Sequence, residues 1–398
     1  MVAPSVAFDV GPLVGPRTGI GAAVAALQAS LLHRDDVTVM PYLTSFRARP
    51  ADGVRRLPLP AALSHRLWAH TDHPRVDRWL PADRVNGNAA DVIHGTNYVV
   101  PPSRLPRLVS VYDCWFLRHP HHAHPDVVRA GKVLLRALRH GAVAHTGSVA
   151  TADALRELVP QATIRTVPLA AIALPAASPQ CPIPELQDRE FVVAVATLER
   201  RKNLPRLVTA FGKLADDHPE LRLVIAGGAG DDRRAVDAAI DLLTPAAAAR
   251  VMLTGYVADE ARSWLLHHAR LLAYPSLDEG FGFPLLDAMQ AGTPIVASDV
   301  GSIPEVAGNA AVLVPPHDVD ALAGAIDRVL TDDQTRSELL AAAPARLATF
   351  SWQATAAGMV QLYTELADGR TGEFGTASTP GTAGAPGIPD TPGSAGAP

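Results

Sequence analysis

A short loop that joins an apolar run to a helical pattern carries the residue types best suited to chemistry. The run ends at Tyr274, and the loop holds Glu279-Gly280-Phe281-Gly282 before Pro284 opens the helical pattern. Glycines let backbone N–H groups approach a ligand closely, and a helix N-terminus offers partial positive charge to an anion. Asp287 falls in the first or second turn of this helix. The same residues also fit an ordinary strand–loop–helix connection, in which Asp287 only complements the helix dipole.

Two adjacent cations follow a second apolar run, 191–196. Arg201 and Lys202 stand in the segment 197–203, just before a helix that we expect to begin near Pro205. Arginine can bind a diphosphate in a bidentate way and lysine as a point charge, so this pair suits a nucleotide diphosphate. The alternative is a solvated basic turn.

The front half offers a glycine loop after its first apolar run. Gly19 and Gly21 end the segment 15–21, whose backbone amides could admit a phosphate or a sugar. The loop lacks the third glycine of a dinucleotide-binding motif, and the second expected strand runs into Pro41-Tyr42 instead of an acidic ribose ligand. A nicotinamide-dependent enzyme is therefore disfavoured.

Three further side chains stand where front-half strands end. Tyr112 and Asp113 stand at the end of the expected strand 108–112, and His94 ends the strand 91–94, so we expect all three at a cleft. A tyrosine with a pKa near ~10 is a poor proton acceptor at neutral pH, so Tyr112 receives no acid–base role. Asp113 can contact an acceptor or serve as a structural N-cap.

These residues must be positioned by the elements around them. Short β-rich runs alternate with helical patterns in both halves, which is typical of buried parallel strands joined by crossover helices. The expected strands are 6–10, 37–40, 91–94, 108–112 and 142–145, then 191–196, 222–226, 251–254, 271–274, 294–297 and 311–314. The sequence therefore predicts an α/β protein with two doubly wound, Rossmann-like domains whose ligand-binding strand ends face each other across a cleft.

Composition shifts divide the chain into five segments. We expect an N-terminal Rossmann-like domain at 1–175, a linker at 176–188, a C-terminal Rossmann-like domain at 189–349, a terminal helix at 350–368 and a disordered tail at 369–398. The tail holds eight Gly and five Pro among small residues. Such a composition buries too little apolar surface to offset its chain entropy.

Composition and charge exclude several classes of protein. The longest uncharged apolar stretch of the 398 residues, 166–184, is broken by five prolines, so no membrane-spanning helix is expected. Two cysteines exclude a disulfide scaffold, and without a signal-type N-terminus we expect a cytoplasmic protein. Residues 1–180 carry 19 Lys+Arg and 12 Asp+Glu, a net +7, while 181–398 carry 16 and 28, a net −12. The positive charges are scattered without aromatic platforms, so nucleic acid is not an expected partner.

Two tracts resemble metal sites, but neither is expected to hold a metal. The tract from His119 to His124 is interrupted by Pro120 and irregularly spaced, which indicates a solvated loop. Asp318-Val319-Asp320 resembles the Asp-x-Asp of metal-dependent transferases, yet it opens an expected helix, where acids cap the first turn. We therefore expect neither a catalytic metal nor a cofactor.

The segment Glu279-Gly280-Phe281-Gly282-x-Pro-x-Leu-Asp-Ala-Met, with 291–294 and 298–305, resembles the signature of the retaining glycosyltransferases of family 4, the glycosyl transferases group 1. Arg201-Lys202 and Gly255-Tyr256-Val257 are similar to two further motifs of that family. The resemblance covers most of residues 5–366. It implies the GT-B fold, with the terminal helix crossing back to the N-terminal domain.

The resemblance also implies roles for these residues. Arg201 and Lys202 would stabilise the leaving diphosphate, and Glu279 with the amides of Gly280, Phe281 and Gly282 would meet the donor sugar. Asp287 stands where the family usually has a glutamate that binds the ribose. Gly255, Tyr256 and Val257 would contact the base, and Gly19 and Gly21 would lie near the donor phosphates. Related sequences commonly read His-Asp where this chain reads Tyr112-Asp113, so Tyr112 and Asp287 both depart from the pattern.

The implied function is that of a retaining hexosyltransferase in polysaccharide, glycolipid or glycoconjugate biosynthesis. It would transfer a hexose from a nucleotide sugar to an acceptor hydroxyl without a metal. GDP-mannose is the preferred donor by resemblance, and UDP-glucose and related UDP-hexoses remain open. A nucleotide-sugar epimerase of the same fold and a noncatalytic sugar-nucleotide-binding relative stay as alternatives.

A run of arginines in the front half suggests a second kind of partner. These are Arg47, Arg49, Arg55, Arg56 and Arg66, and they lie near Leu63, Leu67 and Trp68. This region could rest on an anionic membrane, at the inner membrane face, and reach a lipid-linked acceptor. The alternative is a solvated, irregular region with ordinary surface arginines.

Overall fold

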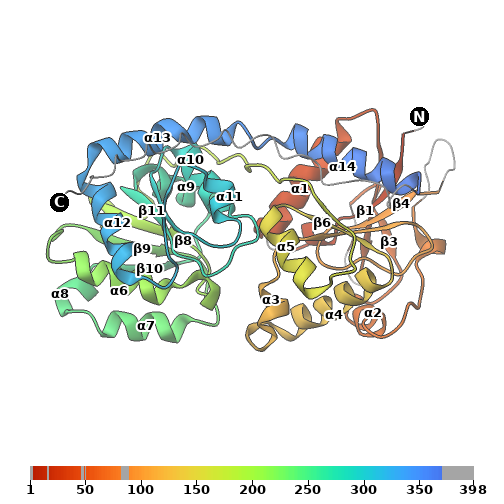
Figure 1. Cartoon of the computed structure of the whole chain (residues 1–398), viewed down its shortest axis with the longest axis horizontal. Helices are drawn as coiled ribbons and strands as arrows, with labels where there is room; N and C mark the ends of the chain where they lie inside the picture. Colours follow the sequence, from red (N-terminus) through yellow and green to blue (C-terminus); the bar gives the residue numbers. More distant parts are fainter. Residues whose placement is uncertain (1–2, 16–17, 46–48, 50, 82–88, 370–398) are drawn as a thin grey trace, which may run out of the picture.

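The chain folds into two lobes, each built around a parallel sheet (Figure 1). The computed structural model describes residues 3–15, 18–45, 49, 51–81 and 89–369. The expected disordered tail lies, apart from Gly369, outside the described residues.

The first lobe holds a seven-stranded sheet in the order β3-β2-β1-β4-β5-β6-β7. Its strands are β1 (Ser5–Asp9), β2 (Thr38–Thr44), β3 (Arg55–Leu57), β4 (Val92–Gly95), β5 (Arg107–Val111), β6 (Val143–Thr146) and β7 (Ile164–Thr166). Its helices are α1 (Gly19–Leu32), α2 (Ala61–Trp68), α3 (Trp115–Arg118), α4 (Pro125–Arg139) and α5 (Val149–Leu158), with 3-10 turns at Gly11–Leu13, Asp77–Trp79 and Pro120–His122. All neighbouring strands run parallel.

The second lobe holds a six-stranded parallel sheet in the order β10-β9-β8-β11-β12-β13. Its strands are β8 (Phe191–Val195), β9 (Arg222–Ala226), β10 (Val251–Gly255), β11 (Leu271–Tyr274), β12 (Ile295–Ser298) and β13 (Val312–Val314). The helices around them are α6 (Leu204–Leu214), α7 (Arg233–Asp241), α8 (Pro245–Ala248), α9 (Asp259–His268), α10 (Phe283–Ala291), α11 (Ile303–Ala307), α12 (Val319–Thr331) and α13 (Asp333–Leu347), with 3-10 turns at Pro184–Leu186 and Arg200–Lys202.

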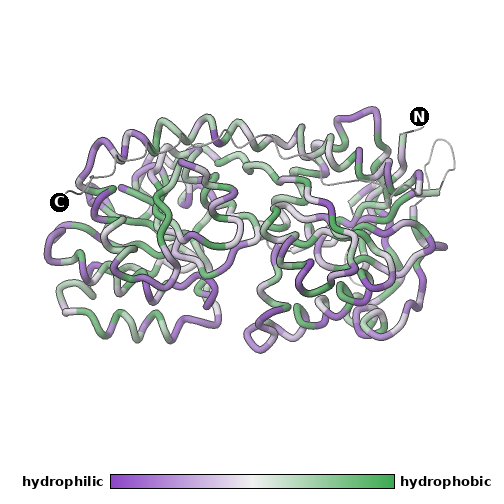
Figure 2. The backbone as a smooth tube through the Cα atoms, viewed as in Figure 1, coloured by the Kyte–Doolittle hydropathy of each residue, from purple (hydrophilic) through white to green (hydrophobic). Residues whose placement is uncertain are grey.

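Strands covered on both faces explain why the apolar runs are nearly continuous in sequence. In β1, Ala7 packs into the core on one face, while Val6 and Phe8 pack into the core on the other. This alternation follows from the two-residue repeat of a strand. The sheets are accordingly the most hydrophobic part of each lobe (Figure 2).

The terminal helix α14 (Trp352–Ala367) returns to the first lobe, as the resemblance implied. Met359, Leu362 and Tyr363 are buried in one cluster with Val24 and Leu27 of α1. The linker after β7 and the segment leading from α13 into α14 both cross between the lobes along the upper edge of Figure 1. The chain therefore connects the lobes twice on that side.

The expected strands are all present, with some differences at their ends. Strand β2 continues through Pro41 and Tyr42 to Thr44, further than the expected strand 37–40, and β3 and β7 were not expected at all. Both unexpected strands are three residues long and contain arginine, so they lack the apolar run that reveals the equally short β13. The exact domain limits stay a prediction. Among the described residues, no helix is both long and apolar enough to cross a membrane.

Candidate active site

The strand order of the second sheet brings Arg201, Lys202 and Glu279 together. From β8 the chain moves to β9 and β10 on one side, whereas β11 starts the series on the other side. Ligands of such sheets bind outside the carboxyl ends of the two strands where the order reverses. The turn 200–202 follows β8 and the loop 275–282 follows β11, so both loops stand at this reversal.

Glu279 is the centre of a buried charge cluster. Its Oε2 accepts a hydrogen bond from Arg201 Nη1 at 3.0 Å, and its Oε1 accepts one from Ser276 Oγ at 2.7 Å. Lys202 Nζ donates to the same Oε1 and lies 3.2 Å from the Tyr274 hydroxyl. Arg201 also reaches Glu199, with Nε 2.9 Å from Oε2. In this structure the two cations are therefore held by carboxylates.

Electrostatics keep Glu279 ionised. Burial alone would raise its pKa, but the charges of Lys202 and Arg201 outweigh burial and lower the pKa to about 2. Burial alone would lower the pKa of Arg201, but the charges of Glu279 and Glu199 outweigh burial and raise that pKa above its usual value. Glu279 and Arg201 are thus charged at neutral pH, whereas burial lowers the pKa of Lys202 and the charge of Glu279 opposes that effect.

Asn203 fixes the basic turn to the loop that carries Glu279. Its backbone adopts a left-handed conformation, with φ of 56°, and its Nδ2 donates to the carbonyls of Pro275 at 2.9 Å and Pro316 at 2.8 Å. Leu277 N also donates to the carbonyl of Arg201 at 2.7 Å. These bonds preorganise the cations, which lowers the cost of orienting them around a ligand.

The glycine motif forms the turn that leads into α10. Gly282 is the N-cap with φ of 95°, a conformation that suits glycine, and Pro284 lies in the first turn as expected. Phe281 is buried against Phe283 and Phe350, with ring centroids 5.2 and 5.7 Å away. Its side chain therefore belongs to the core, and only its backbone remains available to a ligand.

Gly280 lies directly against the first lobe. Its carbonyl accepts hydrogen bonds from Ser148 Oγ at 2.6 Å and Thr151 Oγ1 at 3.0 Å. A Cβ at this position would lie 1.6 Å from the carbonyl oxygen of Tyr112. Only glycine permits this approach, which brings Tyr112 and Asp113 to the charge cluster.

Asp113 reaches the cluster from the first lobe. Burial raises its pKa, and the charge of Arg201 partly offsets this effect. Tyr98 OH donates to its Oδ2 at 3.2 Å, while its Oδ1 accepts from Trp115 N at 3.2 Å at the start of α3. The bond from Trp115 N agrees with the structural role that the sequence suggested for Asp113. The effect of Arg201 on its pKa shows that Asp113 also interacts electrostatically with the other lobe.

Asp287 is buried in α10 and already paired. Its Oδ2 accepts a hydrogen bond from Arg262 Nη1 of α9, and Arg262 Nη2 lies 3.4 Å from Asp259. Burial raises the pKa of Asp287 to about 6 in spite of Arg262. The connection from β10 to α9 contains Gly255, Tyr256 and Val257, and 76% of the Tyr256 surface is exposed. Helix α9 therefore connects the loop that is expected to contact the base with Asp287, which is expected to bind the ribose.

The structure corrects the expectation that His94 lines the cleft. His94 is fully buried, with Nδ1 2.8 Å from the Tyr363 hydroxyl and Nε2 2.9 Å from Ser110 Oγ. Burial holds its pKa well below the usual value, so it is neutral. His94 points to the face of the sheet that α14 covers, and it serves as a core hydrogen-bonding residue.

The glycine loop of the first lobe is only partly available to a ligand. Gly19 begins α1, and a Cβ there would meet no atom within 4 Å. The N–H of Gly21 donates to Thr18 Oγ1 at 3.1 Å, and a Cβ on Gly21 would lie 2.8 Å from the carbonyl of Pro12. Gly21 is therefore needed for packing and capping, whereas Gly19 is open.

The two tracts that resemble metal sites have structural explanations. Asp318 caps α12 by accepting from Ala321 N at 2.8 Å, which confirms the capping prediction. In the histidine tract, His119 stacks on Trp115 with ring centroids 3.9 Å apart. Within the part of the chain that the structure describes, no group of three or more His, Cys, Asp or Glu side chains is arranged to hold a metal.

Sequence reasoning missed several residues around the site. Ser276 bonds Glu279, Arg262 pairs with Asp287, and Glu305 joins the lobes by accepting from Val149 N at 2.9 Å and Ala150 N at 3.2 Å. Glu305 belongs to a segment that carried the family resemblance, and its place just after Pro304 was the available signal. Nothing in the sequence pairs Arg262 with Asp287, because helix-to-helix contacts are not encoded in local spacing.

Comparison with known proteins agrees with this geometry. Residues 182–346 match the family model of the glycosyl transferases group 1. The O-antigen chain mannosyltransferase B of Escherichia coli is 31% identical over 293 residues, which cover 71% of this chain and 75% of that protein. A phosphatidyl-myo-inositol mannosyltransferase of Mycolicibacterium smegmatis is 33% identical over 42% of each chain.

Two solved structures share the fold at low sequence identity. A sucrose-phosphate synthase of Thermosynechococcus elongatus superimposes with a TM-score of 0.68 at 19% identity, covering 92% of this chain and all of the other. HepE of Anabaena, solved in complex with UDP, gives a TM-score of 0.63 at 18% identity over 91% of this chain and all of its own.

The two Rossmann-like lobes have the GT-B fold of these structures. The chain belongs to the glycosyl transferases group 1 family. It is a hexosyltransferase that uses a nucleotide sugar, and the epimerase and noncatalytic alternatives are not favoured.

Proposed function

We propose that the chain transfers mannose from GDP-mannose to an acceptor hydroxyl with retention at the anomeric carbon. The observation that carries the proposal is the Arg201–Glu279–Lys202 cluster at the reversal point of the second sheet. A diphosphate leaving group needs positive charge, and this preorganised pair supplies it away from bulk water. The mannose donor rests on relatives that are named mannosyltransferases.

In this reaction the C1–O bond to the diphosphate breaks and a new C1–O bond forms to the acceptor on the same face of the sugar. Arg201 and Lys202 take up the charge of the departing diphosphate, and one of its phosphate oxygens takes the proton of the acceptor hydroxyl. Glu279 binds hydroxyls of the donor sugar, and Asp287 binds the ribose. None of these steps assigns a role to a metal, so we propose that none is required.

Donor identity is tested by ligand-induced stabilisation. A ligand present at about 100 times its dissociation constant should stabilise the fold by ~2.7 kcal/mol, which raises the melting temperature. GDP should raise it more than UDP does at equal concentration. A larger shift with UDP would replace GDP-mannose by a UDP-hexose, and no shift with either nucleotide would contradict the donor site.

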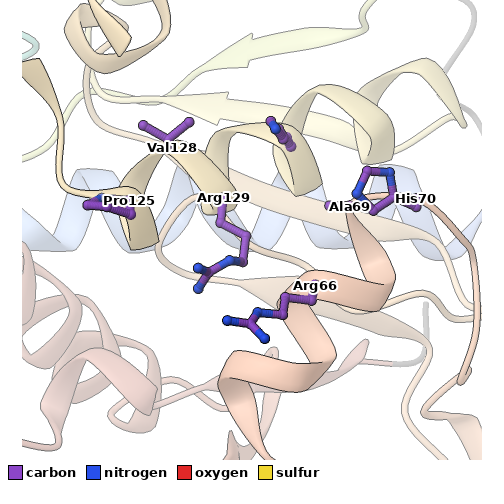
Figure 3. Close-up of a pocket in the computed structure, with 7 residues that line it drawn as sticks. Arg66, Ala69, His70, Pro125, Val128 and Arg129 are labelled. Carbon is purple, nitrogen blue, oxygen red and sulfur yellow. The ribbon is translucent and has the colours of Figure 1, made fainter. Parts of the chain in front are cut away.

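We further propose that the first lobe rests on an anionic membrane surface at the inner membrane face, where a lipid-linked acceptor is reached. A hollow of about 390 Å³ lies between α2 and α4 and is lined by Arg66, His70, Arg129 and Lys132 (Figure 3). Arg66 and Arg129 extend into the same space from opposite helices. Leu63 and Leu67, also on α2, are exposed. This hollow, the basic groove of the first lobe, together with exposed leucines on the same helix suits an anionic phospholipid.

Of the arginines that suggested a membrane surface, Arg66 is the one that lines the hollow. Arg55 and Arg56 belong to strand β3 rather than to an irregular loop, and Arg47 lies outside the described residues. Pelleting with vesicles containing phosphatidylglycerol should fall when Arg66 and Lys132 are changed to Glu, and should weaken with salt. Arg233→Glu with Arg234→Glu, on α7 of the other lobe, makes the same change in net charge and should leave binding intact. Binding that ignores lipid charge would refute the proposal.

A further inference from the structure

The first sheet has a reversal point of its own, where only Gly19 and Gly21 have so far been given an expected role. From β1 the chain moves to β2 and β3 on one side, and β4 opens the series on the other. A ligand crevice is expected outside the carboxyl ends of β1 and β4. The equivalent point of the second sheet holds the Arg201–Glu279–Lys202 cluster.

Asp9 stands at this point, as the last residue of β1. Thr96 Oγ1, just beyond β4, donates to the backbone carbonyl of Asp9 at 2.7 Å and ties the two strand ends together. The Asp9 side chain turns back on its own loop, and its Oδ1 accepts from Gly11 N at 2.8 Å. Within the described residues its Oδ2 accepts no hydrogen bond, although the residue is partly exposed.

Two tyrosines surround this carboxylate. Tyr42 pairs in register with Asp9 on the neighbouring strand β2, and its hydroxyl is buried without a hydrogen-bond partner among the described residues. Burial and then the charge of Asp9 raise the pKa of Tyr42. Burial also raises the pKa of Tyr112, where a hydrogen bond with Ser110 lowers it and the charge of Asp9 adds a smaller increase. Burial likewise raises the pKa of Asp9, to about 7. Unused polar atoms at a crevice are the usual mark of a ligand site.

Tyr112 links this crevice to the reacting centre. Tyr112 follows the carboxyl end of β5, which pairs with β4, and its carbonyl lies against Gly280 of the other lobe. The next residue, Asp113, feels the charges of Arg201 and Glu279. A molecule held at Asp9 would therefore lie across Tyr112 from the donor site.

We propose that Asp9 binds a hydroxyl group of the acceptor and selects a neutral, polyhydroxylated acceptor at this position. The free Oδ2 accepts the hydrogen bond of a hydroxyl, as carboxylates do in a partly buried site. At a pH above the raised pKa of Asp9, about 7, its carboxylate repels a phosphate or carboxylate of an acceptor. Asp9 is a binding residue and takes no proton from the reacting hydroxyl. The inference rests on the proposed function, because it requires a transfer reaction.

Asp9→Asn tests the assignment without removing the local structure. The asparagine oxygen can still accept from Gly11 N, while its NH₂ group replaces the accepting Oδ2 with a donor. Asp91→Asn is a matched control, because Asp91 Oδ2 accepts from Ser5 N at 2.8 Å at the opposite ends of the same two strands. Both variants lose one carboxylate that bonds the backbone of this sheet.

The assay uses GDP-mannose or UDP-glucose as donor and methyl α-D-mannoside, methyl α-D-glucoside and myo-inositol as acceptor probes. Asp9→Asn should raise the acceptor KM at least tenfold and increase the ratio of donor hydrolysis to transfer. The stabilisation by the nucleoside diphosphate should match that of the wild type. Asp91→Asn should keep the acceptor KM within twofold.

Each other outcome is decisive. An unchanged acceptor KM in Asp9→Asn overturns the assignment, and so does a joint loss of acceptor and nucleotide binding, which would place Asp9 in the donor site or in the fold. A wild-type protein that hydrolyses the donor yet transfers to none of the probes refutes the neutral hydroxyl class. A wild-type protein that binds no nucleotide and transfers nothing refutes the proposed function, and the Asp9 assignment falls with it.

Discussion

At the scale of single residues, the proposed donor site is a charge cluster in which both cations are paired with carboxylates. Glu279 and Glu199 neutralise Arg201 and Lys202, so the buried cations have partners in the unliganded protein. A buried charge without a partner costs several kcal/mol, which explains the need for such pairing. An arriving diphosphate then shares cations that are already oriented.

Arg201 provides the first test at this scale. Arg201→Ala should lower kcat/KM at least ~100-fold, because the charge of the leaving group loses one stabilising contact. Arg201→Lys should retain more activity than alanine, since it keeps the charge but loses the second N–H. Steady-state kinetics with a melting curve for each variant checks this. Wild-type turnover in Arg201→Ala would remove Arg201 from the site.

Asp287 provides a test by pH. With a pKa raised to about 6, Asp287 becomes protonated as the pH falls through 6, and the proposed ribose contact weakens. The charges facing it are Arg262, which lowers its pKa, and Asp259, which raises it. Arg262→Gln should therefore move the acid limb of the donor kcat/KM to higher pH, and Asp259→Asn should move it to lower pH. Two shifts of the same sign would contradict the ribose role of Asp287.

The same scale shows where prediction from sequence works. Arg201, Lys202 and Glu279 were predicted from adjacent motifs, because each stands in a loop at a strand end that the apolar pattern locates. His94 was misplaced for a physical reason. It alternates with Ile93 on β4, and its face of the sheet is covered by Tyr363, a residue 269 positions away. Local periodicity carries no information about that contact.

At the scale of elements, α5 and the loop after β11 hold the lobes together. The N-terminus of α5 donates two backbone N–H groups to Glu305, and Ser148 and Thr151 donate to the carbonyl of Gly280. A carboxylate at a helix N-terminus is favoured by the dipole and by the free donors. The contact places Asp113 beside Arg201.

Gly280 tests this contact. Gly280→Ala should lower transfer more than tenfold, because the added Cβ collides with the Tyr112 carbonyl and pushes the lobes apart. Small-angle scattering should show a larger radius of gyration. Gly324→Ala, at an exposed position of α12 where a Cβ meets nothing within 4 Å, should leave transfer unchanged and stabilise the helix by up to ~1 kcal/mol. Normal activity with unchanged scattering in Gly280→Ala would refute the interlobe contact.

Elements with a strong period were the predictable ones. The β-rich runs and the helix α14 were found because buried strands and amphipathic helices repeat a pattern over several residues. Strands β3 and β7 were missed because their three residues include arginine, whereas the equally short β13 is wholly apolar. Helix α14 packs on α1 through Met359 and Tyr363, as its helical spacing and the resemblance implied.

At the scale of the whole molecule, the charge asymmetry follows the division into lobes. The positive half of the sequence folds into the lobe with the basic groove and Asp9, and the negative half folds mainly into the lobe with the donor site. The composition shift at the linker and the alternation of β-rich runs with helical patterns in both halves predicted two lobes, and the strand order then put each candidate site at a reversal point. The relative placement of the lobes depends on contacts such as Glu305 with α5, which no single segment specifies.

The measurement that most directly tests the account is an NMR time course of GDP-mannose with methyl α-D-mannoside in the presence of EDTA. The account predicts that GDP and an α-linked product appear in equal amounts. EDTA should change neither the rate of GDP release nor the rate of product formation. A β-linked product would contradict retention. Loss of activity that Mn²⁺ or Mg²⁺ restores would contradict the metal-independent mechanism, and interconversion of the nucleotide sugar without acceptor would contradict transfer itself.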